Sequence, residues 1–425
     1  MIVKSYFPSQ VVSDLEKMSY DYGLKVAKAI EAEWFHTERG TNRYTTNHNN
    51  FHNLRLYARG EQSTQKYKDE LSINGDLSYL NLDWKPVPII PKFVDIVVNG
   101  IAERMYDVKA YSQDPFGVTK RTEYMESILR DMQTREFNDM AQTEFNIDLY
   151  ENAKEDLPDT QEELELHMQL SYKQAVEIAE EQALNTLFNG NKYELIKKQF
   201  YYDLTVLGIG AVKTSFNTSE GVVIDYVDPA DIVYSYTESP YFDDVYYVGE
   251  VKTIPINELV KQFPHLDQSE LEDIVKNKSY HKTNYNQGYS RNEHDVNKVQ
   301  VLYFNYKTYM NETYKVKETG TGGDKILPKD DSFNPPQDEG NFGKLQKSVE
   351  CLYEGALLLG TGKLLKWEMA KNMMRPKSDY TKCKMNYSIV APRMYKGRIE
   401  SLVSRITGFA DMIQLTHLKL QQVLS

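Results

Sequence analysis

The chain has 425 residues, of which 40% are hydrophobic and 26% charged, and its formal net charge is -12 at pH 7. This length predicts two or three domains, and the composition is that of an ordinary folded protein. No apolar run approaches the roughly 20 residues that a membrane-spanning helix needs, and the first eight residues have too short an apolar core for a secretory signal. We therefore expect neither a membrane span nor a signal peptide.

The two cysteines, Cys351 and Cys383, have no other cysteine or histidine close by in the sequence. This spacing favours reduced, buried thiols in an intracellular protein over a disulfide.

Charge is spread unevenly along the chain. Residues 131–181 hold 15 Asp and Glu against three Lys and Arg, whereas residues 360–425 hold 12 Lys and Arg against four Asp and Glu. Such asymmetry indicates either a surface that faces an acidic polymer or partner, or solvated faces only.

The first 208 residues are predicted to be mainly helical, because apolar residues recur at spacings of three and four. Ser13 and Glu16 predict a capping box at the start of the first helix, Arg59-Gly60 ends the second, and Gly208 ends the last. The predicted helices cover residues 11–35, 51–59, 91–106, 122–189 with a break at 156–159, and 193–207. Residues 40–50 read as a polar, Asn-rich connection, and 108–111 as a strand.

After Gly208 the apolar period changes to two, which is typical of strands. We predict a hairpin of residues 210–216 and 222–227, strands at 232–234 and 245–251, and a second hairpin of 299–306 and 312–317. Further strands are expected at 351–354, 356–359 and 386–390, and helices at 255–263 and 269–278, either continuous or separate. Residues 320–343 read as an exposed loop.

The final segment is predicted to be one long amphipathic helix from Arg398 to the last residue. Its apolar residues recur mostly three or four positions apart: Ile399, Leu402, Val403, Ile406, Phe409, Ala410, Ile413, Leu420 and Leu424. Because the sequence carries no terminal Gly, Asn or Pro there, we expect this helix to pack against something outside the sequence or to continue further.

Glycine-rich stretches do not predict a nucleotide site. Gly208-Ile209-Gly210 follows a helix and precedes a strand, the reverse of the order that a phosphate-binding turn needs. Gly360-Thr361-Gly362-Lys363 resembles half of a P-loop, but Leu357 and Leu364 replace the required Gly and Ser or Thr. We interpret it as a hairpin turn.

Metal and catalytic patterns are also weak. His48 and His52 have the spacing of a helical zinc site but lack a third ligand, so a polar turn is favoured. Asp243-Asp244 and Asp330-Asp331 lack a companion carboxylate and read as surface turns. We therefore expect no catalytic residue, no cofactor and no metal.

Several segments carry a family resemblance by their order and spacing. Tyr57 to Gln62 has the form Y-x-x-G-x-Q, and a helix from Pro91 to Tyr106 leads into 108–115. Asp203 through Gly210 leads into the hairpin and Asp228-Pro229, and 387–414 enters a long helix. Together they resemble the portal protein of tailed bacteriophages, most closely that of the crAss-like phages.

The resemblance implies an α+β, portal-like fold: a mixed helix and strand wing over 1–253, a first stem helix in 254–285, a small α/β clip over 286–392 and a second stem helix over 393–425. Portals of this type usually continue beyond this helix into further wing and crown segments, and the sequence departs from that pattern because it stops here. It also implies a ring of about twelve copies, a homododecamer, at one capsid vertex.

In such a ring, double-stranded DNA passes through the channel during packaging and ejection. The implied partners are the major capsid protein, terminase and tail or head-tail adaptor proteins, with no membrane. The implied location is the virion, after assembly in the host cytoplasm. The alternatives are another capsid-associated interaction protein without a channel, or a DNA-processing enzyme whose active-site residues are not recognised.

We expect 255–278 and 398–425 to lie side by side, with Ile399, Val403, Ile406 and Ile413 facing protein. The basic residues proposed to face the channel or a partner are Lys396, Arg398, Arg405 and Lys419. On one helix, Arg398 and Arg405 would share a face and Lys419 would return near it. The alternative is that these side chains pair with acidic residues of a neighbouring subunit.

Overall fold

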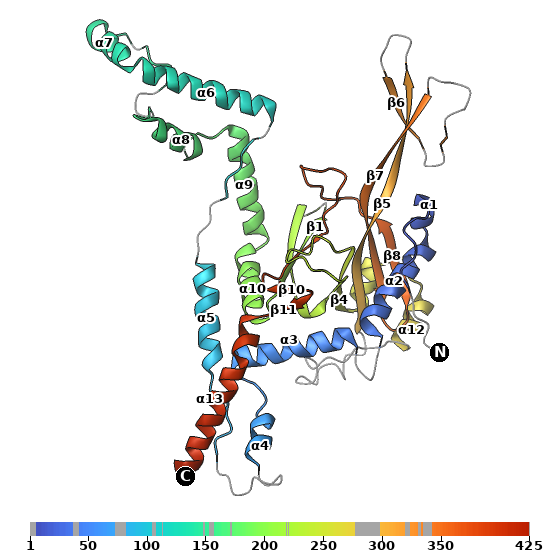
Figure 1. Cartoon of the computed structure of the whole chain (residues 1–425). Helices are drawn as coiled ribbons and strands as arrows, with labels where there is room; N and C mark the ends of the chain where they lie inside the picture. The colour runs from blue at the N-terminus through green and yellow to red at the C-terminus, as the bar shows by residue number, and fades with distance from the viewer. Residues whose placement is uncertain are drawn as a thin grey trace. The chain divides into compact units, whose positions relative to one another are not determined.

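The structure, a computed structural model, forms two compact units: a main unit of Met1–Glu103 and Leu195–Ser425, and a helical unit of Arg104–Glu194 (Figure 1). It describes residues 6–36, 42–72, 82–103, 108–112, 114–147, 149–152, 157–170, 172–217, 219, 221–276, 298–318, 324–329, 333–334 and 342–424. The fold class is α+β, as predicted.

Helices of the main unit lie before, between and after its strands. They are α1 (Asp14–Lys17), α2 (Tyr20–Phe35), α3 (Arg43–Arg59), α4 (Gln65–Leu71), α5 (Ile89–Ala102), α10 (Tyr193–Val206), α11 (Ile256–Gln262), α12 (Gln268–Lys276) and α13 (Leu402–Leu424). Local signals set several boundaries. Asn42 caps α3 by accepting from the Thr45 backbone N–H, and Gly60, with a positive φ of 73°, ends it.

The strands of the main unit are all paired antiparallel. They are β1 (Gly210–Asn217), β2 (Gly221–Val227), β3 (Ile232–Tyr234), β4 (Tyr247–Pro255), β5 (Lys298–Glu318), β6 (Asp324–Lys329), β7 (Phe342–Leu358), β8 (Lys363–Met369), β9 (Tyr387–Val390), β10 (Met394–Tyr395) and β11 (Arg398–Ile399). One sheet has the order β3-β4-β5-β7-β8, with β6 on β5; a second has the order β2-β1-β9. The predicted hairpin of β1 and β2 and the strands β3 and β9 are confirmed.

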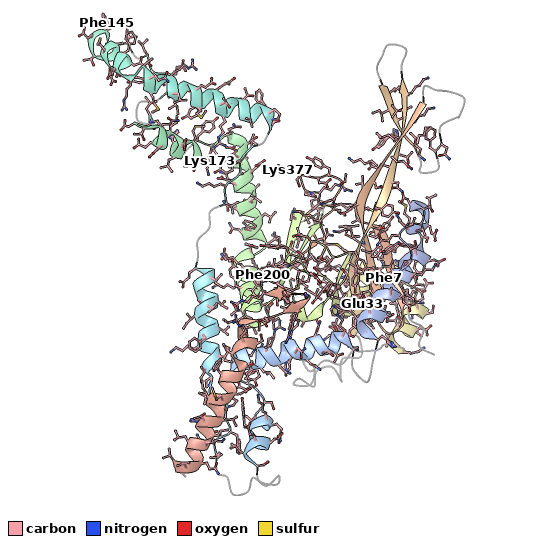
Figure 2. The ribbon with its side chains drawn as sticks, viewed as in Figure 1. Phe7, Glu33, Phe145, Lys173, Phe200 and Lys377 are labelled. Carbon is pink, nitrogen blue, oxygen red and sulfur yellow. The ribbon has the colours of Figure 1, made fainter. Side chains whose placement is uncertain are left out.

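One face of the six-stranded sheet is covered by α2. The Trp34 side chain of α2 is fully buried, and its indole N–H donates to the Tyr247 hydroxyl at 3.0 Å. Phe7 stacks on the Tyr247 ring at 5.4 Å, and the Tyr247 hydroxyl donates to Glu33 at 2.6 Å. Figure 2 labels Phe7 and Glu33, which lie close to each other in that view. This aromatic cluster anchors the N-terminal segment on the sheet.

A second apolar cluster joins α3, α5 and α13 to the three-stranded sheet. Its buried members include Ala58, Ile90, Val94, Ile209, Ala211, Ile389, Val403 and Ala410. A third cluster, of α11 and α12 with β5, β7 and β8, includes Leu259, Phe263, Ile274, Val301, Leu358 and Leu365.

The helical unit holds α6 (Pro115–Gln133), α7 (Arg135–Phe145), α8 (Gln161–Leu170) and α9 (Ala175–Gly190). Its core is small: Ile128, Leu157, Leu164 and Met168. Two carboxylates of α9 hold the extended segment 108–112, because Glu177 accepts from the Ser112 backbone N–H and Glu181 from that of Ala110.

Several sequence predictions of local structure are wrong. Asp324–Lys329, inside the segment predicted as a loop, form the strand β6. The second hairpin is instead the single strand β5, because Thr308 to Asn311 contain no Gly or Pro and pair with Cys351 to Ser348 of β7. The Asn-rich residues from 43 onward are helical in α3. Residues 108–111 are not a strand. Within 298–318, 324–329 and 342–392, the structure has strands and no α-helix, so the helical part expected of the clip is not found there.

The six-stranded sheet combines strands from the predicted wing and the predicted clip, since β4 of the wing pairs with β5 of the clip. The division into a wing, a first stem helix, a clip and a second stem helix remains a prediction about the assembled protein. Cys351 and Cys383 are free and buried, as predicted.

Candidate functional site

The segment that leads into α13 is a tight hairpin. Strands β10 and β11 pair Tyr395 with Arg398, and the two residues between them, Lys396 and Gly397, have positive φ values of 47° and 73°. This is the backbone of a two-residue hairpin turn. Ser401 then caps α13 by accepting from the Ser404 backbone N–H at 2.9 Å. The helix therefore begins at Leu402, not at Arg398.

The four predicted basic residues are all exposed, but they do not form one row. Lys396 and Arg398 belong to the hairpin, so the prediction that Arg398 and Arg405 share a helical face is wrong. Arg405 and Lys419 do lie on α13; at about 100° and 1.5 Å per residue they are separated by roughly 40° and 21 Å. With the described residues none of the four makes an ion pair, so all four remain available to an acidic partner.

The buried side of α13 is partly polar. The Asp411 carboxylate accepts hydrogen bonds from the hydroxyls of Tyr57, at 2.9 Å, and Tyr67, at 2.7 Å, and forms an ion pair with Lys66. Burial would raise the pKa of Asp411, but the hydrogen bonds from Lys66, Tyr67 and Tyr57 outweigh it and lower the pKa. Asp411 is therefore held as a carboxylate that joins α13 to α3 and α4.

Gln414 is the second buried polar residue of α13. Its side-chain carbonyl accepts from the Val87 backbone N–H at 2.8 Å, and its amide N–H donates to the Lys85 carbonyl at 3.2 Å. The extended segment before α5 is thus fixed to α13 through its backbone.

Apolar contacts complete this inner side. Val403 and Ala410 belong to the cluster of α3 and α5, Ile399 and Ile406 pack against it, and Leu418 packs with Tyr67 and Leu82. The predicted pairing of 255–278 with 398–425 is wrong within one chain, because α11 and α12 pack on the six-stranded sheet in a separate cluster.

The outer side of α13 exposes large apolar side chains. They are Phe409, Met412, Ile413, Leu420, Val423 and Leu424. Ile413 was predicted to face protein and is exposed in the single chain. The helix therefore buries a carboxylate and an amide on its inner side and exposes six large apolar side chains on its outer side, an arrangement typical of a helix with a further partner.

Sequence reasoning missed a buried ionic cluster that fixes α3. Arg55 donates to both oxygens of Asp228, at 2.7 and 2.9 Å, and to Asp203 at 3.2 Å. Burial raises the pKa of Asp203 to about 6, although Arg55 opposes the rise. In the sequence analysis Asp228 was interpreted only as part of a turn. The signal that could have revealed the cluster is Arg55, a charged residue among the apolar positions of a predicted helix.

The two glycine-rich motifs lie as predicted. Gly360 and Gly362, with φ of 90° and 63°, form the turn between β7 and β8, and Gly208-Ile209-Gly210 joins α10 to β1. His48 and His52 were predicted to lie in a polar turn, and this is wrong: both lie within α3, where burial lowers both pKa values. Asp330-Asp331 lies outside the described residues. Among the residues that are described, no three His, Cys, Asp or Glu gather as potential metal ligands.

No family model matches this chain, and no curated protein matches it. Among the described helices, none combines the length and apolar character needed to cross a membrane.

Proposed function

We propose that this chain is the subunit of a viral portal ring, which forms the channel for packaging and ejecting double-stranded DNA at one capsid vertex. The observation that carries the proposal is the outer side of α13, where Phe409, Met412, Ile413 and Leu420 are exposed in a single chain. A ring closes through heterologous contacts, in which a surface of one copy meets a different surface of the next. An exposed apolar helix face fits such a contact.

The charge of the chain is compatible with a conduit for DNA. Phosphate contacts repeated over every subunit would hold a DNA strand rather than let it pass. A net charge of -12 with only a few exposed basic residues on α13 and its hairpin avoids that retention. Arg405 and Lys419 either face the channel, as separated belts of positive charge that centre a polyanion weakly in salt, or pair with acidic residues of the neighbouring copy. Arg405 lies four residues before Phe409 and so on the outer side of α13, where the second arrangement applies if that side contacts the next copy.

The proposed partners are the major capsid protein, terminase, and tail or head-tail adaptor proteins. The proposed location is the portal vertex of the virion. Because no described element closes over the outer side of α13, we place the contact between copies there and the docking of other proteins elsewhere on the ring.

Negative-stain electron microscopy of the purified chain tests the ring. The expected result is a closed ring with a central hole, with native mass spectrometry giving about twelve copies. Particles without a hole would contradict the portal and favour a different capsid-associated interaction protein. Nuclease or ATPase activity abolished by one Asp substitution would favour a DNA-processing enzyme instead.

The role of the basic residues is tested separately by Arg405→Glu. A channel role predicts intact rings with altered packaging or ejection, because the belt of charge changes sign. An ion pair between subunits predicts poor ring assembly. Unchanged rings together with unchanged packaging would show that Arg405 has neither role.

A further inference from the structure

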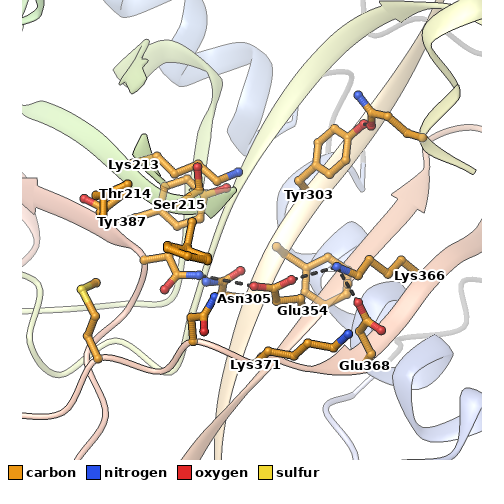
Figure 3. A pocket seen from close by; sticks show the side chains of 18 of the residues that line it. Lys213, Thr214, Ser215, Tyr303, Asn305, Glu354, Lys366, Glu368, Lys371 and Tyr387 are labelled. Atoms are coloured by element: carbon orange, nitrogen blue, oxygen red, sulfur yellow. Dashed lines mark hydrogen bonds and ion pairs between the residues drawn. The ribbon is translucent and has the colours of Figure 1, made fainter. Parts of the chain in front are cut away.

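A cavity between the two sheets of the main unit has its charges matched within the chain. It has a volume of about 740 Å³ and lies between β1 and β9 on one side and β5, β7 and β8 on the other (Figure 3). Lys366 pairs with both Glu354 and Glu368, and Lys371 adds a second positive charge near Glu368. The cavity therefore favours a ligand of neither charge, and the open apolar surface of the main unit lies on two of its helices.

The exposed side of α13 has the spacing of a helix that packs lengthwise on another helix. Steps of four and three residues alternate along it, and every member is exposed: Phe409, Ile413, Thr416, Leu420 and Val423. Such a repeat averages 3.5 residues and keeps one stripe turned toward a neighbouring helix along its whole length. We therefore expect the partner of this side to be a helix.

The helix α5 presents a stripe of the same kind on the same compact unit. Ile89, Phe93, Ile96 and Gly100 follow one another at steps of four, three and four residues. Phe93 and Ile96 are 53% and 59% exposed, and Ile89 is half-buried. At 1.5 Å per residue this stripe is about 17 Å long and that of α13 about 21 Å, so the two match in length.

Both stripes stay open in a single chain. Ile90 and Val94 of α5 share a buried cluster with Val403 and Ala410 of α13, so the two helices turn their inner sides toward one core. Ile96 lies roughly 200° around α5 from Val94. The outer stripes therefore point away from that core, and each is available to a second copy.

The charges near the two stripes are complementary. On the outer side of α13 they are Arg405 and Lys419, because its carboxylate, Asp411, is buried on the inner side. The exposed charges of α5 and its end are Asp95 and Glu103 against one cation, Lys92. Opposite charges at the rim of an apolar contact determine which surfaces pair and in which register.

Each helix also carries an exposed glycine on its outer side. A Cβ at Gly100 or at Gly408 would meet nothing within 4 Å. Glycine inside a helix is less favourable than alanine, although the chain has room for a methyl group at both positions. Glycines placed in this way fit the close approach of a second helix.

We propose that the outer side of α13 of one copy packs lengthwise on the outer side of α5 of the next copy, with Arg405 and Lys419 near Asp95 and Glu103. The inference rests on the proposed contact between copies at α13 and names the surface that it meets. Two unlike surfaces form this contact, as a ring requires. Each copy then contacts two neighbours, and a closed ring leaves neither stripe open.

Cysteine cross-linking of the full chain tests the pairing. Cys351 and Cys383 are buried, so an added surface cysteine reacts selectively with a short bismaleimide. We expect a chain with both Ile96→Cys and Ile413→Cys to give a ladder of covalent multimers on a denaturing gel. Each single variant should give no cross-link, and co-expression of the two single variants should give a covalent dimer only.

The cross-links also identify other partners. A dimer from Ile413→Cys alone would overturn the proposal, because two α13 stripes would then face each other. Cross-linking of Ile413→Cys to Met140→Cys, an exposed position of α7, instead of to Ile96→Cys would overturn it as well.

Electron microscopy of the same samples scores ring formation separately. A ladder without closed rings would support the pairing and contradict the portal. Absence of the ladder would overturn the pairing whether or not rings form, and rings without a ladder would leave the portal standing.

Charge substitutions followed by sedimentation velocity give a second readout. Ile96→Asp should leave the chain folded, because residue 96 faces water in a single chain, and should abolish assembly. The matched control is Ile326→Asp, since Ile326 is also an exposed isoleucine, at 56%, but lies on β6. It should leave assembly unchanged. Assembly that survives Ile96→Asp, or that is lost equally in both variants, would contradict the contact at α5.

Discussion

The guanidinium of Arg55 lies 3.2 Å from the carboxylate of Asp203, although both side chains are buried. Arg55 belongs to α3 and Asp203 to α10, and the same guanidinium holds Asp228 after β2. A buried ionic contact adds little net stability, but loss of one partner leaves an uncompensated charge. The cluster therefore fixes how α3 packs on the helix and sheet beside it.

The first prediction is that Asp203 makes the protein less stable as pH rises from about 4 to about 6. Burial raises its pKa in the folded chain from 3.8 to about 6, so the folded state keeps a proton that the unfolded state releases. Stability then falls as pH rises, by roughly 3 kcal/mol for this one group. Urea unfolding of the wild type and of Asp203→Asn at pH 4.5 and 6.5 measures this change in the free energy of unfolding.

The Asp203→Asn variant has no proton to release at this position. As pH rises, the wild type should therefore lose unfolding free energy relative to the variant. Asp231, whose pKa burial also raises to about 6, is present in both proteins and cancels. A difference that stays constant would show that Arg55 keeps Asp203 ionised throughout.

The second prediction concerns the carboxylate that joins α13 to α3 and α4. Asp411→Asn keeps the shape of the side chain but removes the charge that Tyr57, Tyr67 and Lys66 hold, so it should cost about 2 kcal/mol at pH 7. Because the folded pKa of Asp411 is lowered, this contribution is present above the unfolded pKa near 4 and is lost as pH falls below it.

Denaturant unfolding of Asp411→Asn and wild type at pH 7 and pH 3 measures this effect, and the gap should narrow at pH 3. Glu400→Gln, an exposed carboxylate just before the helix, is the control and should change stability by less than about 0.5 kcal/mol. Equal losses in the two variants would mean that the bonds to Asp411 add nothing specific.

Local signals explain which parts of the fold could be predicted from sequence. The end of α3 at Gly60, the turn at Gly360 to Gly362 and the hairpin of β1 and β2 are marked by residues within each segment. The strand β5 could not be found this way, because the polar residues at its centre are strand only through pairing with β7. Pairing over such a sequence distance leaves no local pattern.

The site was predicted only in part for the same reason. Periodicity located a long amphipathic helix, and Ile399, Val403 and Ile406 face protein as predicted. Ile413 was predicted to do the same but is exposed. In the structure Asp411 and Gln414 are buried because Tyr57, Tyr67 and the backbone of residues 85–87 supply hydrogen bonds. Those partners lie more than 300 positions away in the sequence, so the pattern of α13 alone could not reveal them.

The third prediction contrasts two glycines. A Cβ at Gly208 would lie 2.5 Å from the Glu400 carbonyl oxygen, and its φ is +81°, so Gly208→Ala should destabilise the protein by about 2 kcal/mol or more. A Cβ at Gly408, inside α13, would meet nothing within 4 Å, so Gly408→Ala should stabilise it by roughly 0.5–1 kcal/mol. Thermal unfolding of both variants shows whether each substitution raises or lowers the stability of the protein. A Gly208→Ala variant as stable as the wild type would show that the Glu400 carbonyl does not lie this close to residue 208.

The last prediction separates folding of the chain from assembly. Phe409 is 64% exposed on α13 and Val403 is fully buried on the same helix. Phe409→Asp should leave the unfolding free energy of the single chain within about 0.5 kcal/mol, because the new charge stays in water. If the outer side of α13 is a contact between copies, the same variant should abolish rings, since a charge without a partner would then be buried at every interface.

Val403→Asp should instead unfold the chain, since it places the charge in the cluster of α3 and α5. Circular dichroism with negative-stain images of both variants distinguishes the outcomes. Folded Phe409→Asp that still forms rings in wild-type yield would show that the outer side of α13 faces solvent in the assembly, and the contact between copies would have to be sought on another surface.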